Sequence, residues 1–471
     1  MIEAASAFRP ALHRAFEDAL SFLESLDNGP VSASIDVTTL RNRLSRSMES
    51  EPTDPVRVIE DLVRDVEGGI LGMPGGRFYA WVIGGSLPAA LAADWLTSAW
   101  DQNAALYSCS PAAAVVEEVV GVWLKDLLCI PQSASFALVT GCQMAHVTAL
   151  AAARHSLLAR AGWDIEERGL YGAPPIRVIS SSNRHASIDR AIRLLGLGTR
   201  HVEYIEPGED ETMDAQALIS ALEARGGRPT IVVLQAGDIN TGVFDSFQTL
   251  VPIAMEHGAW VHIDGAFGLW AAATPEYRDM TKGAGAANSW ATDGHKWLNV
   301  PFDSGYVFVA DAEAHRASLS TRAPYITENA IARDQIDWNP EWSRRARGFS
   351  TYAALRQLGR DGIADLIGRS CRYAQKLVDG IGSLEGAQVL WRPNINQGLV
   401  RFLASGSDAS ISEHDRRTQQ VIDHVVQGGQ AYFGPTTWRG MRAMRISVLN
   451  WQTSDSDVAR AITAVADALH A

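Results

Sequence analysis

The sequence has few cysteines and no long uninterrupted hydrophobic run. Its four cysteines, Cys109, Cys129, Cys142 and Cys371, include no Cys-x-x-Cys pair, so neither a disulfide framework nor a zinc knuckle is predicted. Charged residues interrupt every long apolar stretch, as Asp94 does, and none reaches the ~20 apolar residues of a membrane-spanning helix. The N-terminus lacks a basic segment followed by an apolar one, so we expect no signal peptide. These absences predict a cytoplasmic protein with no membrane partner.

Basic residues are outnumbered by acidic ones. The 471 residues include 41 Lys and Arg against 54 Asp and Glu, a formal net charge of −13. An acidic surface repels phosphate backbones, so nucleic acid is not an expected partner. Hydrophobic residues make up 46% of the chain and charged residues 20%, which excludes a largely disordered protein. At about 150 residues per domain, this length suggests two or three domains.

The N-terminal part is predicted to be helical. Over residues 4–26 apolar side chains recur at steps of three and four, which indicates an amphipathic helix; they are Phe8, Leu12, Phe16, Leu20 and Leu23. We assign residues 1–77 to this helical segment. Its apolar face has two possible partners, its own domain or a second subunit.

The central part, residues 78–350, is predicted to be an α/β domain. Short runs rich in Val, Ile and Phe alternate with helical patterns such as 146–159 and 187–195. The expected strands are 135–140, 177–180, 230–234, 260–263 and 305–309. This alternation is typical of a mostly parallel sheet covered on both faces, in which ligands bind at the carboxyl ends of the strands. Residues 351–471 are expected to form a smaller α+β domain, with strands at 398–403 and 444–449 and a last helix at 456–470.

Three strand ends carry residues suited to chemistry. The small-residue turn 141–146 follows one strand and opens a helix, whose N-terminus can bind phosphate, although a plain turn is the alternative. Asp264 follows four apparently buried residues, where a carboxylate needs a cationic partner unless it is exposed or caps a helix. Lys296 lies between His295 and Trp297. This setting is unusual for a solvated lysine, and a desolvated lysine has a lowered pKa and is an amine nucleophile toward aldehydes. Taken singly, Lys296 is still expected to be a surface lysine.

Together these features match the needs of pyridoxal 5′-phosphate. The aldehyde of this cofactor forms an imine with a lysine, its ring nitrogen is kept protonated by a carboxylate, and its phosphate binds a helix end. The combination therefore predicts a pyridoxal-phosphate enzyme.

The sequence also resembles the pyridoxal-phosphate-dependent group II amino acid decarboxylases, which include aromatic-L-amino-acid, glutamate and histidine decarboxylases. The segment DGHKWLNVPFD at residues 293–303 carries the resemblance. Four further motifs keep their order and spacing: 181–197, 237–245, 262–268 and 342–347. The resemblance extends from about Phe78 to the C-terminus and implies fold type I, a large α/β domain with a small C-terminal domain.

The resemblance implies roles around the cofactor ring. Lys296 would form the internal Schiff base and Asp264 would pair with the pyridinium nitrogen. Ala266 would pack against one ring face, while His185 would stack on the other near the substrate carboxylate. Tyr325 lies where the family often has a tyrosine that reprotonates the substrate Cα, and members that make aldehydes tend to have Phe there.

The resemblance also places the phosphate, and here the chain departs from the family pattern. Gly141, Cys142 and Gln143 fall in the phosphate-binding turn, with Asp293 and His295 close by. In this turn an amide side chain, Gln143, replaces the usual hydroxyl donor. Asp293 stands where some members have Asn. A further departure is Asp238-Ile239, which stands where the family has Thr-Thr.

We therefore expect a homodimeric enzyme that decarboxylates an L-amino acid to its primary amine. The aromatic residues Phe78, Tyr79, Trp81 and Trp100 suggest an aromatic or apolar substrate if they line a pocket, but they can equally be core. One alternative is another reaction of the same cofactor, by a carbon–carbon lyase, an aldehyde synthase or an aminotransferase; for the last, Arg445 is a candidate for gripping a carboxylate. The other alternative is a protein that binds pyridoxal phosphate without turnover. No metal is expected.

Overall fold

The computed structural model describes the chain except for residues 1–3, 225–226, 322–331 and 407. Tyr325 therefore lies outside the described residues. The chain packs into two units, which we describe separately. The first contains Met1–Ile83, Gln375–Trp391 and Leu399–Ala471, and the second contains Gly84–Ala374 and Arg392–Gly398. The division of the chain at residues 77 and 350 stays a prediction.

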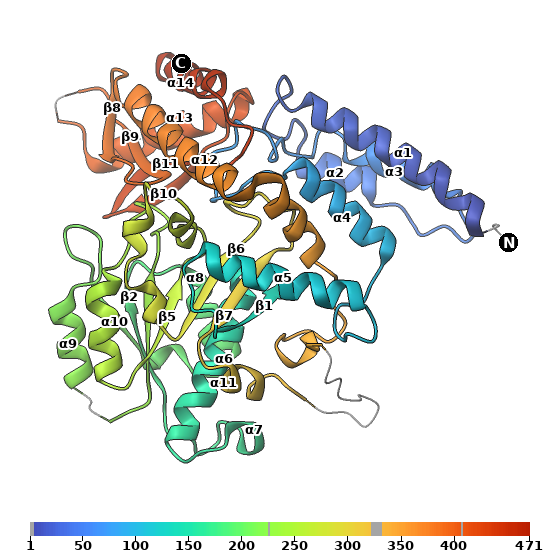
Figure 1. Cartoon of the computed structure of the whole chain (residues 1–471). Coiled ribbons are helices and arrows are strands. Elements are labelled where there is room, and N and C mark those ends of the chain that lie inside the picture. Colours follow the sequence, from blue (N-terminus) through green and yellow to red (C-terminus); the bar gives the residue numbers. More distant parts are fainter. Residues whose placement is uncertain (1–3, 225–226, 322–331, 407) are drawn as a thin grey trace. The chain divides into compact units, whose positions relative to one another are not determined.

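The second unit is built on a seven-stranded sheet with the order β1-β7-β6-β5-β4-β2-β3 (Figure 1). The strands are β1 (Ser135–Val139), β2 (Arg177–Ser181), β3 (Val202–Ile205), β4 (Thr230–Gln235), β5 (Trp260–Asp264), β6 (Ser289–Asp293) and β7 (Gly305–Val309). Strand β7 runs antiparallel to both of its neighbours, β1 and β6, and the other neighbouring pairs are parallel. The mostly parallel sheet expected from the sequence is confirmed, and all five expected strands are present.

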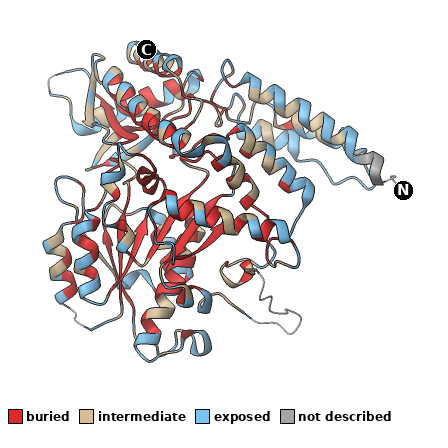
Figure 2. Cartoon of the chain, in the orientation of Figure 1, coloured by how far each residue is buried: buried red, intermediate tan, exposed pale blue. Residues whose placement is uncertain are grey.

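Helices shield the sheet, and its strands are buried along their whole length except at β3 (Figure 2). The helices of this unit are α4 (Pro88–Trp100), α5 (Pro111–Leu127), α6 (Cys142–Arg160), α7 (Ile165–Arg168), α8 (Ala186–Leu194), α9 (Ala215–Glu223), α10 (Phe247–Glu256) and α11 (Ala312–Ala317). Helix α6 presents small side chains to the sheet, and Ala149, Ala152 and Ala153 are fully buried in its core cluster. Small residues allow close approach of the helix backbone, which brings the start of α6 near the strand ends.

The first unit combines a second sheet with helices. Its strands have the order β10-β11-β9-β8, and both outer pairs are antiparallel. Their bounds are β8 (Ala387–Trp391), β9 (Gln397–Phe402), β10 (Gly434–Trp438) and β11 (Met441–Ser447), with α13 (Ile411–Gly428) and α14 (Asp455–His470) beside them in sequence. The two strands and last helix expected here are present, whereas β8 and β10 were not expected.

The N-terminal residues of the same unit form α1 (Ala4–Ser25), α2 (Val37–Leu44) and α3 (Pro55–Val66). Helix α1 agrees with the expected amphipathic helix. The long helix α12 (Gly348–Gly382) contains residues of both units and is kinked at Gly359, where φ is 60°. No helix in the described part of the chain is long and apolar enough to span a membrane.

A buried ion pair ties the motif at 342–347 to helix α5. The side chains of Arg344 and Glu117 are fully buried, with Nη1 and Oε1 2.7 Å apart. Arg344 also donates to the backbone oxygens of Ala104 at 2.8 Å and Leu138 at 2.6 Å. Burial raises the pKa of Glu117, whereas Arg344 lowers it.

We expect Arg344→Met to destabilise the protein strongly. The change would leave the Glu117 carboxylate buried without its cation, which costs about 3–5 kcal/mol of unfolding free energy. The matched control is Arg360→Met, because Arg360 pairs with Asp126 and both side chains are more than half exposed; its cost should stay below about 1 kcal/mol. Urea unfolding followed by circular dichroism measures both. Equal losses in the two variants would contradict the importance of the buried pair.

Candidate functional site

The candidate site lies at the carboxyl ends of β1, β5 and β6. Strands β5 and β6 are parallel neighbours, so Asp264 and Asp293, their last residues, lie at the same edge of the sheet. Strand β1 also ends there: Val139 pairs with Gly305 of β7, which pairs with Asp293 on its other side. The topology therefore brings the turn at residue 141 next to the ends of β5 and β6, as the sequence predicted.

Asp293 connects two parts of this site. Its Oδ1 accepts a hydrogen bond from the backbone N–H of Cys142, the first residue of α6, at 2.6 Å. Its Oδ2 lies 3.1 Å from Lys296 Nζ. The helix begins after Gly141, which has no side chain to cap it, so a carboxylate from β6 occupies the positive end of the helix dipole.

Lys296 is a cation in this arrangement. Burial alone would lower its pKa, but Asp293, with Cys142 and Asp264, outweighs burial and raises the pKa above its ordinary value. The expectation of a lowered pKa is therefore wrong. That expectation took account of desolvation but not of Asp293, three residues earlier, whose carboxylate lies next to the lysine ammonium in the folded chain.

The loop that carries Lys296 is fixed from two sides. Gly85 donates its backbone N–H to Asn299 Oδ1 at 2.7 Å, and Asn299 Nδ2 donates to the Trp297 carbonyl at 2.9 Å. A Cβ added at Gly84 would lie 2.0 Å from the Lys296 carbonyl oxygen, so only glycine fits there. We did not single out Gly84 or Asn299 from the sequence. The φ of Asn299 is 54°, in the left-handed region, which Asn tolerates better than most residues do.

Asp264 is buried and charged. Its Oδ1 accepts the backbone N–H of Ala266 at 3.2 Å, and its Oδ2 lies 3.6 Å from His146 Nε2. Burial would raise its pKa, but His146, His185 and Lys296 hold the pKa below the usual range. The alternative of an exposed strand-end carboxylate is therefore wrong.

His185 is exposed at the start of α8. Its Nδ1 accepts the backbone N–H of Ser187 at 3.3 Å and lies 2.7 Å from Ser187 Oγ, so the ring is oriented from one side. The ring is among the groups that act electrostatically on Asp264. Gln143 reaches the same turn, since its Nε2 donates to the Ser187 carbonyl at 3.2 Å.

His295 is held near the helix end. Its Nδ1 donates to the Ser304 carbonyl at 2.9 Å, and its ring stacks on Phe302 with centroids 4.5 Å apart. Burial lowers the pKa of His295, so the imidazole is neutral near pH 7. With Nδ1 protonated, Nε2 is the acceptor nitrogen of this tautomer.

The Asp238 departure has a structural explanation. Asp238 Oδ1 accepts from the backbone N–H groups of Asn240 and Thr241 and from Thr241 Oγ1, at 2.8–2.9 Å. The carboxylate therefore holds the turn after β4 closed.

The residues present fit pyridoxal phosphate. A half-buried lysine and a buried, charged carboxylate lie close together, an exposed imidazole acts electrostatically on the carboxylate, and a 19-residue helix begins beside them. A metal fits less well. Cys142, His146 and Asp264 have ligand atoms within 4.8 Å of one another, but burial, with Asp293, raises the pKa of the Cys142 thiol well above its usual value, and metals bind the thiolate.

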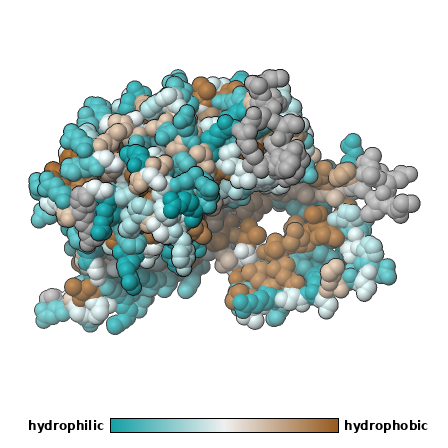
Figure 3. All heavy atoms as spheres, turned by 90° about the horizontal axis from the view of Figure 1, so that it is seen from below, coloured by the Kyte–Doolittle hydropathy of each residue, from teal (hydrophilic) through white to brown (hydrophobic). Residues whose placement is uncertain are grey.

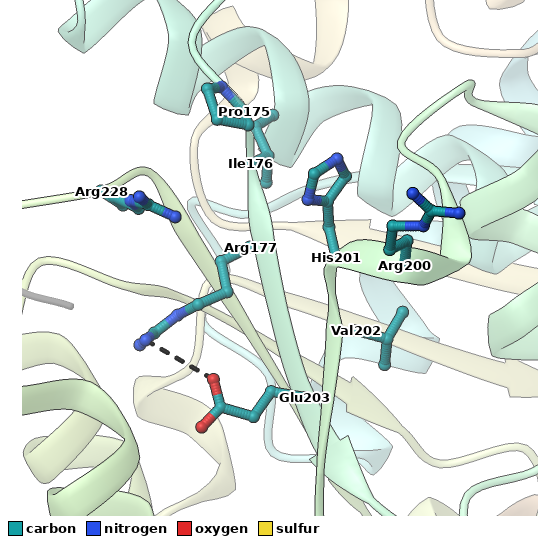
Figure 4. A pocket seen from close by; sticks show the side chains of 8 residues that line it. All are labelled: Pro175, Ile176, Arg177, Arg200, His201, Val202, Glu203 and Arg228. Atoms are coloured by element: carbon teal, nitrogen blue, oxygen red, sulfur yellow. Dashed lines mark ion pairs between the residues drawn. The ribbon is translucent and has the colours of Figure 1, made fainter. Parts of the chain in front are cut away.

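A pocket of about 280 Å³ lies at the amino ends of β2 and β3. Figure 4 shows Arg177 directed toward Glu203, and the structure places the two side chains 3.7 Å apart. Arg200, His201 and Arg228 also line this pocket. Because it lies at the amino ends of the strands, it is not part of the candidate site.

The geometry defines a pyridoxal-phosphate enzyme, and comparison with known proteins specifies the family. Residues 38–404 match the model of the pyridoxal-dependent decarboxylase conserved domain. The chain belongs to this family of pyridoxal-dependent decarboxylases. It is a pyridoxal-phosphate-dependent carboxy-lyase that acts on an amino acid, as the motifs predicted, and its cofactor is pyridoxal 5′-phosphate.

Individual proteins are similar to this chain over nearly its whole length. An aromatic-L-amino-acid decarboxylase of Bacillus atrophaeus is 26% identical, with 96% of this chain and 94% of the relative covered. A phenylacetaldehyde synthase of a Rosa hybrid cultivar is 24% identical, with 98% and 93% covered. A crystal structure of Oryza sativa TDC with PLP and tryptamine has a TM-score of 0.93 at 22% identity, with 100% and 99% covered. The expected type I fold is thereby confirmed.

Proposed function

We propose that the enzyme decarboxylates an aromatic or otherwise apolar L-amino acid and releases the primary amine. The observation that carries the assignment of its site is the cluster of Lys296 with the buried carboxylates of Asp264 and Asp293, on which the exposed ring of His185 acts electrostatically. The substrate class is supported by the names of the relatives, which include tyrosine and tryptophan decarboxylases.

Each residue of the cluster has a distinct task. When bound, pyridoxal phosphate supplies an aldehyde for covalent attachment and a ring that accepts the electron pair left when CO2 departs. Lys296 provides the amine, and Asp293, 3.1 Å away, holds Nζ in place as an ammonium, which must lose a proton before it can attack. Asp264 remains a carboxylate and would keep the ring nitrogen of the cofactor protonated. Ala266, which is only partly buried and donates its backbone N–H to Asp264, would pack against one face of the ring.

Other residues orient the reactants. His185, fixed by Ser187, would contact the cofactor ring and orient the carboxylate of the substrate. The first turn of α6, with Gly141, Cys142, Gln143 and the neutral ring of His295, binds the phosphate. Tyr325, which lies outside the described residues, is proposed from the sequence alone to return a proton to Cα.

An aldehyde synthase is the second candidate, because two phenylacetaldehyde synthases are among the similar proteins. The presence of Tyr rather than Phe at position 325 favours simple decarboxylation. The two reactions differ in their products, an amine in one case and an aldehyde in the other.

We expect the holoenzyme, incubated with a mixture of L-amino acids, to convert an aromatic member into the amine that is lighter by CO2. Mass spectrometry of the products identifies the substrate and the reaction together. Tyr325→Phe should lower amine formation by about 10²–10⁴-fold, the usual contribution of a positioned proton donor, and should raise the share of aldehyde.

Lys296→Ala is the control, and it should form no product. Borohydride should fix the cofactor to the parent protein but not to this variant, because the lysine amine is absent. An aldehyde as the main product of the parent enzyme would contradict simple decarboxylation, and an amine from acidic amino acids alone would contradict the substrate class.

We also propose that the enzyme is a homodimer formed through its N-terminal helices. Within their unit α1 packs on α3, yet apolar side chains of both remain exposed, including Leu12 at 60% and Leu62 at 51%. Figure 3 shows hydrophobic side chains gathered near the N-terminal end of the chain. A groove of about 840 Å³ runs between these helices, lined in part by Phe22, Ile59 and Val63. Exposed apolar surface of this extent marks an interaction site.

We expect Leu12→Glu to weaken dimerisation by about tenfold or more, because a charge replaces an apolar side chain at the contact. Analytical ultracentrifugation over a range of protein concentrations measures the association. Met48→Glu is the matched control, since Met48 is 99% exposed outside the three helices. The proposal fails if the parent protein has the mass of one chain, or if both variants associate as the parent does.

A further inference from the structure

A chain of buried hydrogen bonds runs beneath Asp264. Trp260 Nε1 donates to Ser289 Oγ at 2.9 Å, and Ser289 Oγ lies 2.9 Å from His262 Nδ1. His262 Nε2 then lies 2.9 Å from His146 Nδ1. His146 Nε2 is the end of the chain, 3.6 Å from Asp264 Oδ2. Both imidazoles are fully buried, and the decarboxylase mechanism described above uses neither.

One of the two possible directions of the protons along this chain suits the negative charge of Asp264. The indole of Trp260 can only donate, so the hydroxyl proton of Ser289 can point to His262 Nδ1. His262 then carries its proton on Nε2 and donates to His146 Nδ1, which leaves the proton of His146 on Nε2, facing Asp264. The negative charge of Asp264 favours this arrangement over the reverse one, in which a lone pair would face the carboxylate.

Both histidines are neutral. Burial, with the neighbouring His146, lowers the pKa of His262 to about 3, and burial lowers the pKa of His146 despite Asp264 and Asp293. The chain therefore presents a dipole to Asp264 and no second cation. The same nitrogen lies 3.4 Å from the Cys142 sulfur, which is a weak partner.

We propose that His146, oriented through His262 and Ser289, is a positioning residue that keeps the Asp264 carboxylate weakly basic, so that the proton it shares with the cofactor stays on the ring nitrogen. An N–H directed at a carboxylate favours its charged form. In a buried site such a dipole acts strongly. The inference rests on the proposed place of Asp264 at the ring nitrogen.

The other groups that face this pair stay constant in the test. Asp264 is faced by His146 from α6, by His262 on its own strand, by His185 at the start of α8 and by Lys296 after β6. His146 is faced in addition by Asp293 from β6. Substitutions at His146 and His262 leave Lys296 and His185 in place, so a change in the cofactor reports on the histidine chain.

The experiment measures two properties of the cofactor-loaded protein besides turnover. One is the pH midpoint of the visible absorbance of bound pyridoxal phosphate, and the other is its dissociation constant. In His146→Leu and His262→Leu we expect the pH midpoint to rise by about 0.5–1 pH unit, because a less protonated ring withdraws less electron density from the imine. We expect the dissociation constant of the cofactor to rise about tenfold in the same variants. His262→Gln, which keeps one donor and one acceptor, should move the midpoint back toward the parent value.

His315→Leu is the matched control. His315 is also fully buried, burial lowers its pKa to about 3, and it contacts Ser135 Oγ at 2.8 Å, but Ser135 is at the opposite end of β1 from the site. This variant should keep the parent midpoint even if it loses stability. A shift as large as that of His146→Leu would overturn the inference, because any buried histidine would then produce it.

Parent-like midpoints in folded His146→Leu and His262→Leu would also overturn it. If thermal unfolding shows that His146→Leu does not fold, the His262→Leu and His262→Gln pair decides: different midpoints support the inference and equal ones overturn it. Asp264→Asn separates this inference from the proposed function. A shift in Asp264→Asn but not in the histidine variants removes only the role of His146, whereas no shift in any variant removes Asp264 from the ring nitrogen.

Discussion

The site depends on one carboxylate that has two partners. Asp293 accepts the first N–H of α6 and lies against the ammonium of Lys296, so it joins a helix end, a strand end and the reactive lysine. A buried carboxylate is costly unless its charge is met. Here the dipole of α6 and the ammonium of Lys296 together compensate the charge of Asp293, so the positions of the helix end, the strand end and the lysine depend on one another.

The remaining electrostatics of the site follow from this arrangement. Lys296 is held as a cation, which in turn helps Asp264, the next carboxylate along the sheet edge, to stay charged. The histidines around them are desolvated and neutral, as the lowered pKa values of His146, His262 and His295 show. Charge is thus confined to the groups that the chemistry of pyridoxal phosphate uses.

Periodicity and strand-end motifs in the sequence were enough to predict the sheet and the edge at which the candidate residues come together. Residues whose role depends on contact with a residue distant in the sequence could not be predicted in this way. Strand β3 is only half buried and β6, SWATD, contains polar residues, so neither has the apolar pattern of its neighbours. The lowered pKa predicted for a desolvated Lys296 was wrong, because the lysine lies close to Asp293 only through a tight turn that the spacing of the residues does not reveal. Gly84 likewise gains its meaning only from contact with Lys296.

The most direct measurement is the pH dependence of the rate at which the cofactor-free protein captures the aldehyde of pyridoxal phosphate covalently. It should be compared between the parent and Asp293→Asn, which keeps the shape of the side chain and removes its charge. Asp293 raises the pKa of Lys296, so its loss should free the neutral amine at lower pH and move the midpoint of the rate profile downward. A midpoint that stays unchanged or moves upward would contradict the account of the site as a lysine held by Asp293.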